Sequence, residues 1–186
     1  MTTAPTIETQ RLRLRAHVSA DFDAYADVFA SARAGYMGQL KRRQAWFSFC
    51  SDVAQWSLFG HGAWAVERLD DDALVGQVAL LKPDHFPELE LGWMMTEAGE
   101  GKSYAFEAAQ MARDFAYAEL GRDTLVSYID PNNTRSIALA TRLGALRDDT
   151  AARPDGETLE ETIVYRHPDA AALLEGDHDG GMEAYA

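Results

Sequence analysis

The segment from Glu88 to Ala108 carries the residues best suited to bind an anion. An extended apolar run over Leu89–Met95 leads to Gly99 and Gly101, and a helical pattern opens at about Lys102. The first backbone N–H groups of a helix have no intrahelical partner, so they point at whatever lies before them. Glycines let a backbone approach a phosphate closely, and the lysine adds positive charge. The segment therefore predicts a phosphate-binding turn between a strand and a helix.

Three interpretations of this turn are open. The letters GEGKS look like the end of the nucleotide P-loop motif Gly-x-x-x-x-Gly-Lys-Ser, but that motif needs glycine where Thr96 stands. The second interpretation is a loop that holds the pyrophosphate of acetyl-CoA. The third is a glycine-containing turn that binds nothing, because short glycine motifs are common. The rest of the chain has to decide between them.

The composition narrows the class of partner. The formal net charge of −13 over 186 residues argues against nucleic acid, because nucleic-acid binders need basic faces. An acidic surface suits a cationic acceptor such as an amine, although it also simply keeps a protein soluble. No run approaches the roughly 20 apolar residues of a membrane helix, and the first residues do not resemble a signal peptide. We expect a cytoplasmic protein without a metal site; its oligomeric state is open, and a homodimer is compatible with the sequence.

The length predicts one domain with a short tail. We expect residues 1–167 to form that domain and residues 168–186 to be an acidic C-terminal tail, partly disordered. The single cysteine, Cys50, excludes an internal disulfide, and we interpret it as a buried apolar residue and not as a nucleophile.

Hydrophobic periodicity predicts the elements that position the turn. Alternation over Arg11–Arg15 predicts a strand with one wet face, and a nearly continuous apolar run over Thr124–Ile129 predicts a buried strand. The other expected strands are Ala63–Arg68, Leu74–Leu81, Leu89–Met95 and Leu159–Tyr165, and the expected helices are Ser19–Phe29, Lys41–Phe59, Lys102–Leu120 and Asn133–Leu143.

Three stretches in this order resemble the GNAT superfamily, specifically its RimJ/RimL-like branch. They are the start ETQRLRLRAHVSADFDAY, the segment ELELGWMMTEAGEGKSYAFEA, and SYIDPNNTRSIALATRLGA with an Asn-x-x-Ser helix that ends in Leu-Gly. The resemblance covers roughly Ile7 to His167. Each stretch is weak evidence alone, but the ordered set is specific, and a P-loop enzyme would not explain the first or the third stretch.

The resemblance implies an α/β (α+β) GNAT fold, with a mixed, mostly antiparallel twisted sheet of about 6–7 strands and about four flanking helices. The strands Leu89–Met95 and Thr124–Ile129 would run parallel and splay apart, so that the pantetheine arm of acetyl-CoA can bond to unpaired backbone between them. The implied cofactor-binding residues are Met94 and Met95 for the arm, Gly101, Lys102, Ser103, Tyr104 and Ala105 for the diphosphate, and Asn133, Arg135 and Ser136 at the next helix start.

The resemblance also implies an N-acetyltransferase that moves the acetyl group to a primary amine in a ternary complex. Glu90, in the family's Glu-Leu-Gly, is the candidate base, with Glu88 as the alternative. The N–H of Met95 would polarise the thioester carbonyl. Ser136 would protonate the leaving thiolate, and Tyr128 is a second candidate for that role.

This chain departs from the family pattern at two places in the turn. Ser103 stands where glycine is usual, and we expect it to take helical dihedral angles; Glu100 places a negative charge near the phosphates. Because of these departures, a catalytically weak CoA-binding or regulatory module is the alternative function. A protein-interaction domain that uses the acidic tail is a third.

Overall fold

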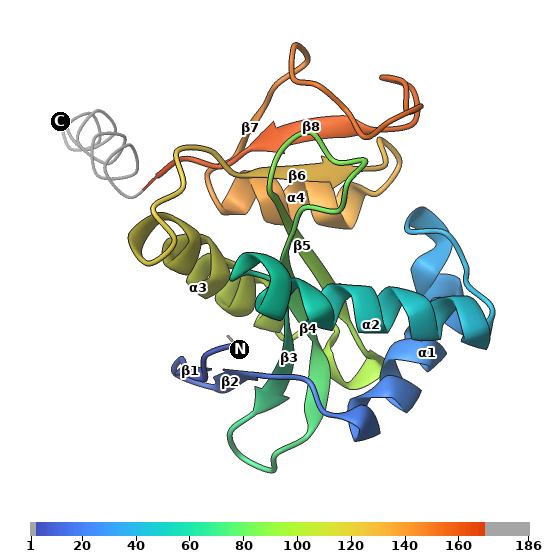
Figure 1. Ribbon diagram of the computed structural model, residues 1–186, viewed down its shortest axis with the longest axis vertical. Helices are drawn as coiled ribbons and strands as arrows, with labels where there is room; N and C mark the ends of the chain where they lie inside the picture. The colour runs from blue at the N-terminus through green and yellow to red at the C-terminus, as the bar shows by residue number, and fades with distance from the viewer. Residues whose placement is uncertain (1–2, 170–186) are drawn as a thin grey trace, which may run out of the picture.

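The computed structural model describes residues 3–169, which form one mixed sheet with helices on both faces (Figure 1). Within these residues the sheet has eight strands in the order β1-β2-β3-β4-β5-β6-β8-β7. Neighbouring strands are antiparallel except for the parallel pair β5 and β6. The strands are β1 (Ile7–Glu8), β2 (Leu12–Arg15), β3 (Ala63–Arg68), β4 (Leu74–Leu81), β5 (Glu90–Met95), β6 (Val126–Ile129), β7 (Leu146–Arg147) and β8 (Ile163–Arg166).

Four α-helices lie along the described residues: α1 (Phe22–Ala30), α2 (Arg42–Phe59), α3 (Tyr104–Ala118) and α4 (Thr134–Arg142). Three short 3₁₀ turns cover Ser19–Asp21, Ala32–Tyr36 and Glu97–Gly99. The sequence predicts mixed α/β architecture, four helices and one parallel strand pair, and all three are confirmed. The strand count exceeds the expected 6–7 because β1 and β7 are only two residues each, too short to produce a periodic signal.

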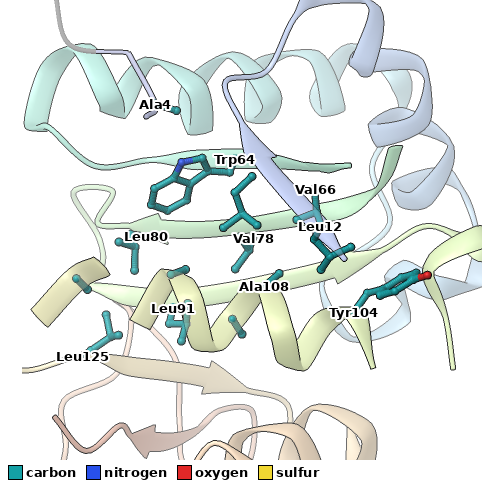
Figure 2. Close-up of a cluster of buried hydrophobic side chains, with 14 of the residues drawn as sticks. Ala4, Leu12, Trp64, Val66, Val78, Leu80, Leu91, Tyr104, Ala108 and Leu125 are labelled. Atoms are coloured by element: carbon teal, nitrogen blue, oxygen red, sulfur yellow. The ribbon is translucent and has the colours of Figure 1, made fainter. Parts of the chain in front are cut away.

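The face of the sheet under α3 carries the larger apolar core (Figure 2). Side chains at alternate strand positions, among them Leu12, Trp64, Val78 and Leu91, are fully buried there. The helix meets them with alanines, and Ala108 is one of four with no exposed surface. Small side chains let the helix backbone lie close to the sheet, which fixes the position of its N-terminus.

Helices α1 and α2 cover the opposite face with a second cluster of aromatic side chains. Phe22 and Tyr25 both pack against Phe49 there, with ring centroids 5.7 and 5.3 Å from that of Phe49. Met94 of β5 packs against this cluster. Helices α1 and α2 therefore lie against β5, one of the two strands that border the predicted cleft.

Two local expectations are wrong. Cys50 is exposed on α2, because the buried positions of this helix are Ala45, Phe49, Gln55 and Trp56. The last strand begins at Ile163 and not at Leu159, because residues 158–162 form a turn in which the Thr158 carbonyl accepts from the Glu161 and Thr162 N–H groups. The acidic tail lies outside the described residues from position 170 onward.

Candidate functional site

The parallel strands β5 and β6 pair only at their beginning. Glu90 lies opposite Val126, and that is the single register pair between them. The Val126 N–H donates to the Leu89 carbonyl at 3.1 Å. One step further, the Ser127 hydroxyl donates to the Leu91 carbonyl at 2.6 Å, where an adjacent strand would present a backbone N–H. The strands therefore splay apart toward Met95 and leave strand edges unpaired.

Strand alternation decides which backbone groups of β5 face this opening. The Thr96 N–H donates to the Val75 carbonyl of β4 at 3.0 Å, so the N–H and C=O of Met95 point the other way, into the opening. Trp93 lies two positions before Met95, so its backbone N–H and C=O also face the opening. The backbone groups of Met94 face β4, so Met94 offers the cleft only its side chain. Trp93 is thus a site residue that the sequence interpretation missed.

A cleft of about 1000 Å³ continues this opening across the N-termini of α3 and α4. It brings together residues from four separate parts of the chain. Its lining includes Met94, Met95, Gly101, Ser103, Tyr104, Ala105, Asn133, Arg135 and Ser136. Every predicted cofactor-binding residue except Lys102 therefore lines one cleft, together with Arg33 and Tyr36 from the segment between α1 and α2.

The turn before α3 reaches the cleft through two left-handed residues. Gly101 has φ +68° and Ser103 has φ +61°, so the prediction that Ser103 takes helical dihedral angles is wrong. As a result α3 begins at Tyr104 and not at about Lys102. The first intrahelical bond there runs from the Glu107 N–H to the Ser103 carbonyl at 3.2 Å. The N–H groups of Tyr104, Ala105 and Phe106 therefore have no intrahelical acceptor and face the cleft end of the helix.

Gly99 serves the packing of the turn. A Cβ at this position would lie 2.2 Å from the Val75 carbonyl oxygen, closer than any side chain permits. The glycine lets the turn lie directly against β4. The sequence interpretation assigned Gly99 to phosphate approach, whereas its contact with the strand already requires glycine.

Contacts of Arg11 and Glu107 fix the position of the turn before α3. The Glu107 carboxylate accepts from the Thr9 hydroxyl at 2.6 Å and from the Arg11 Nε at 2.7 Å. The Arg11 guanidinium also donates to the Lys102 carbonyl at 3.1 Å and lies over the Tyr104 ring at 4.8 Å. These contacts tie the N-terminal strand region to the turn, and they give Glu107 a structural role.

Glu100 lies between two arginines at the rim of the cleft. Its carboxylate contacts Arg33 at 2.5 Å and Arg135 at 2.9 Å. The pKa of Glu100 is lowered mainly by the Arg33 guanidinium. The negative charge that the sequence places near the phosphates is therefore compensated within the protein.

The start of α4 is built as the sequence predicts. The Asn133 side chain caps the helix, because its Oδ1 accepts from the Ser136 N–H at 3.1 Å. The Ser136 hydroxyl accepts from the Trp93 indole N–H at 3.3 Å. That bond spans the opening from β5 to α4 and leaves the hydroxyl proton of Ser136 free to be donated elsewhere.

Glu90 lies on the other face of β5, where its carboxyl group folds over Gly92. Its Cδ is 3.6 Å from the position that a Cβ on Gly92 would occupy. Burial, together with the charge of Asp52, raises the pKa of Glu90 to about 8. A carboxylate with a pKa near neutrality is suited to take a proton from an ammonium group.

Glu88 and Tyr128 are engaged elsewhere. Arg166 binds the Glu88 carboxylate through both terminal nitrogens, at 2.7 and 3.0 Å, and the Thr124 hydroxyl donates to it at 3.0 Å. The Arg166 guanidinium lowers the pKa of Glu88, which makes it a weak base. The Tyr128 hydroxyl accepts from the Glu88 N–H at 3.2 Å. The Arg166 contacts favour Glu90 over Glu88 as the base. Ser136 lines the cleft and Tyr128 does not, which favours Ser136 as the proton donor.

Two negative findings concern residues 3–169. No helix in this range combines the length and the apolar character that a membrane crossing requires. No group of three or more His, Cys, Asp or Glu side chains in the same range is arranged to hold a metal ion.

Comparison with known proteins identifies the class to which this fold and cleft belong. The profile of the acetyltransferase (GNAT) domain matches residues 11–146. The crystal structure of an acetyltransferase from Agrobacterium tumefaciens str. C58 is 40% identical, with a TM-score of 0.84, covering 91% of this chain and 97% of that one. RimL, a ribosomal L7/L12 alpha-N-protein acetyltransferase in complex with coenzyme A, shares the fold at 15% identity and a TM-score of 0.67, over 90% of this chain and 99% of that one.

The chain belongs to the GNAT acetyltransferase family, and it is an acyltransferase. A curated relative, the uncharacterized N-acetyltransferase YnaD of Bacillus subtilis (strain 168), is 27% identical over 79 residues. That match covers 42% of this chain and 46% of YnaD, so the chain spans about half the length of this relative.

Proposed function

We propose that this protein transfers the acetyl group of acetyl-CoA to a primary amine by direct attack in a ternary complex. The observation that carries the proposal is the split between β5 and β6, which opens onto the turn at Gly101–Ala105 and has Glu90 on the opposite face of β5. Acetyl-CoA supplies the activated acyl carbon and a thiol leaving group. The protein supplies binding, orientation and proton transfer.

The residues of the cleft fit a thiol-ended nucleotide. The outward backbone groups of Trp93 and Met95 can bond to an extended amide arm as an added strand would. The helix N-terminus at Tyr104 offers unpartnered N–H groups to a diphosphate. Arg135 is 83% exposed at the side chain, and its ion pair within residues 3–169 is to Glu100 at 2.9 Å. It can therefore turn toward a phosphate at small cost.

Each catalytic step has a candidate residue. Glu90 accepts a proton from the acceptor ammonium, directly or through a water molecule, and leaves a neutral amine. The amine nitrogen then bonds to the acyl carbon, while the carbon–sulfur bond breaks with its electron pair on sulfur. The outward N–H of Met95 donates to the carbonyl oxygen. Ser136 provides the proton that converts the departing thiolate to a thiol. The second proton, which the amine nitrogen loses as the amide forms, restores the Ser136 hydroxyl through water.

The test measures free thiol released from acetyl-CoA in the presence of a panel of primary amines. We expect amine-dependent release, and we expect Glu90→Gln to lower kcat by about 100-fold or more while the Kd for acetyl-CoA stays unchanged. Ser103→Glu should abolish acetyl-CoA binding because it adds a negative charge beside the phosphates. Equal turnover of Glu90→Gln at all pH values would remove Glu90 from the role of base. Tight acetyl-CoA binding without release for any amine would favour the CoA-binding module instead.

A further inference from the structure

Three side chains on the α1/α2 face of the sheet bring oxygen acceptors together. Asp52 comes from α2, Gln77 from β4 and Glu90 from β5. The strand register places Ala79 opposite Gly92, between Gln77 and Glu90 on the same face. The floor between the two polar side chains is therefore made only of a methyl group and a glycine.

The hydrogen bonds in this cluster leave acceptors in excess. Asp52 Oδ2 accepts from the Gln77 Nε2 at 3.1 Å and from the Tyr25 hydroxyl at 3.2 Å. Gln77 is 6% exposed, and its Oε1 is buried without a hydrogen-bond partner. Among residues 3–169, neither Asp52 nor Glu90 forms an ion pair with a lysine or an arginine.

The charges that face Glu90 from the surrounding elements are mostly negative. Burial, then Asp52 from α2 and Glu157 from the segment before β8, raise the pKa of Glu90 to about 8, whereas the backbone N–H of Tyr128 lowers it. Burial raises the pKa of Asp52 to about 6, and its neighbours Gln77, Tyr25 and His17 lower it. Two carboxyl groups that share one region without a cation repel each other. Apart from His17, the groups that face the two carboxyl groups supply no positive charge with hydrogen-bond donors.

We propose that Asp52, Gln77 and Glu90 form the binding site for the ammonium group of the acceptor, so that the enzyme selects amines that arrive as cations. The inference rests on the proposed function. A primary ammonium group has three N–H donors, which match the Gln77 Oε1 and the two carboxyl groups. Asp52 and Gln77 bind and orient the substrate, and Glu90 accepts its proton.

The small floor adds a steric requirement. A methyl group at position 92 would lie 3.6–3.8 Å from the carboxyl atoms of Glu90, which is ordinary van der Waals contact. Gly92→Ala therefore keeps the fold and the charges but fills the space between Glu90 and Gln77. It provides a variant that weakens ammonium binding without removing a hydrogen-bonding group.

The direct test titrates the Glu90 carboxyl carbon by ¹³C NMR with methylammonium as the probe. Tetramethylammonium is the matched control because it has the same charge and no N–H donor. We expect saturating methylammonium to lower the apparent pKa of Glu90 by about one unit or more, and tetramethylammonium to leave it nearly unchanged. Equal shifts with the two cations would overturn the proposal, since they would show only general attraction to an acidic surface.

Variants complete the test with methylamine as the acceptor in the thiol-release assay. Asp52→Asn and Gly92→Ala should each raise KM for methylamine at least tenfold, and Asp52→Asn should also move the rise of kcat/KM to lower pH. Asp27→Asn, an exposed charge change on α1, should change neither. The Kd for acetyl-CoA should stay constant in all of them. An unchanged KM in Asp52→Asn would refute the ammonium site while leaving acetyl transfer intact, whereas absence of thiol release by the unmodified enzyme with every amine would refute the proposed function itself.

Discussion

The hydroxyl of Ser127 donates to the carbonyl of Leu91 at 2.6 Å, across the point where β5 and β6 part. Before this point β5 and β6 share a backbone hydrogen bond, from the Val126 N–H to the Leu89 carbonyl. Beyond it the register of the sheet contains no further residue pair between the two strands. A side chain thus replaces the missing backbone donor at the apex of the cleft. The arrangement keeps the last buried carbonyl satisfied and lets the next residues diverge.

Removing that hydroxyl should destabilise the protein. Ser127 is 2% exposed, and its loss would leave both the Leu91 carbonyl and the imidazole of His167, 2.9 Å from the hydroxyl, without this partner. We expect Ser127→Ala to lower the free energy of unfolding by about 1–3 kcal/mol, measured by urea denaturation. Thr141→Ala, which removes an exposed helix hydroxyl, is the control and should change stability by less than about 0.5 kcal/mol. Equal stability of the two variants would show that the Ser127 bond does not stabilise the apex.

His167 should make stability depend on pH below neutrality. Burial lowers its pKa to about 3, so the unfolded chain binds a proton between about pH 6.5 and 3 that the folded chain does not. Stability is therefore lost as pH falls through this range. We expect the native protein to lose about 2 kcal/mol between pH 7 and pH 5 relative to His167→Gln.

The comparison with His167→Gln isolates this effect. Glu90, with a pKa of about 8 in the folded state, acts in the opposite direction, because the folded protein holds a proton that the unfolded chain releases above its ordinary carboxyl pKa. Both proteins contain Glu90, so its contribution cancels in the difference. Parallel stability curves of the two proteins from pH 7 to pH 5 would contradict the assignment of a buried neutral His167.

The charge of Glu100 should oppose cofactor binding only weakly. Because Arg33 and Arg135 already compensate this carboxylate, Glu100→Gln frees both guanidinium groups for phosphate. We expect the Kd for acetyl-CoA to fall about two- to fivefold at low salt, in line with the small worth of exposed ion pairs. Glu97→Gln is the control, since Glu97 is 91% exposed and 3.9 Å from Arg33. A weaker affinity in Glu100→Gln, measured by calorimetry, would mean that Glu100 positions the arginines for the ligand.

Ser103 carries backbone strain that glycine would relieve. A left-handed conformation costs a non-glycine residue roughly 1–2 kcal/mol, and part of that gain is offset because glycine is more flexible in the unfolded chain. Ser103→Gly should therefore raise the free energy of unfolding by up to about 1 kcal/mol. Ser103→Ala removes only the hydroxyl, which lies 3.4 Å from Arg142, and should give no gain. A lower stability of Ser103→Gly in thermal denaturation would show that the hydroxyl contact outweighs the strain.

Local sequence signals predict the parts of the site that are built from neighbouring residues. The strand–turn–helix segment around Gly101 and the Asn133 cap follow from helix-start chemistry, which acts over three or four residues. The dihedral angles of Ser103 do not follow from that chemistry. They depend on the path of the turn, which the close contact between Gly99 and β4 constrains. This contact joins residues that are well separated in the sequence, so a local signal does not predict it.

Contacts between residues far apart in the chain could not be predicted. Arg11 supports the turn 91 residues away at Lys102, and nothing in its strand pattern distinguishes it from the arginines that follow. Glu88 and Glu90 have the same residue type and lie two positions apart, yet Arg166 lowers the pKa of Glu88 whereas burial and Asp52 raise that of Glu90. The pairing of Asp52 with Gln77 is hidden for the same reason, since each appears as one polar position in an apolar element.

The most direct test of acetyl-CoA binding between β5 and β6 is a titration with acetyl-CoA that follows backbone amide shifts by NMR. We predict saturable shifts at Met95, at residues 101–106 and at residues 133–136, with little change in the β1–β2 hairpin. Saturable binding without shifts in these three segments would contradict acetyl-CoA binding between β5 and β6. Shifts concentrated around the separate groove lined by Leu58 and Lys82 would contradict it as well.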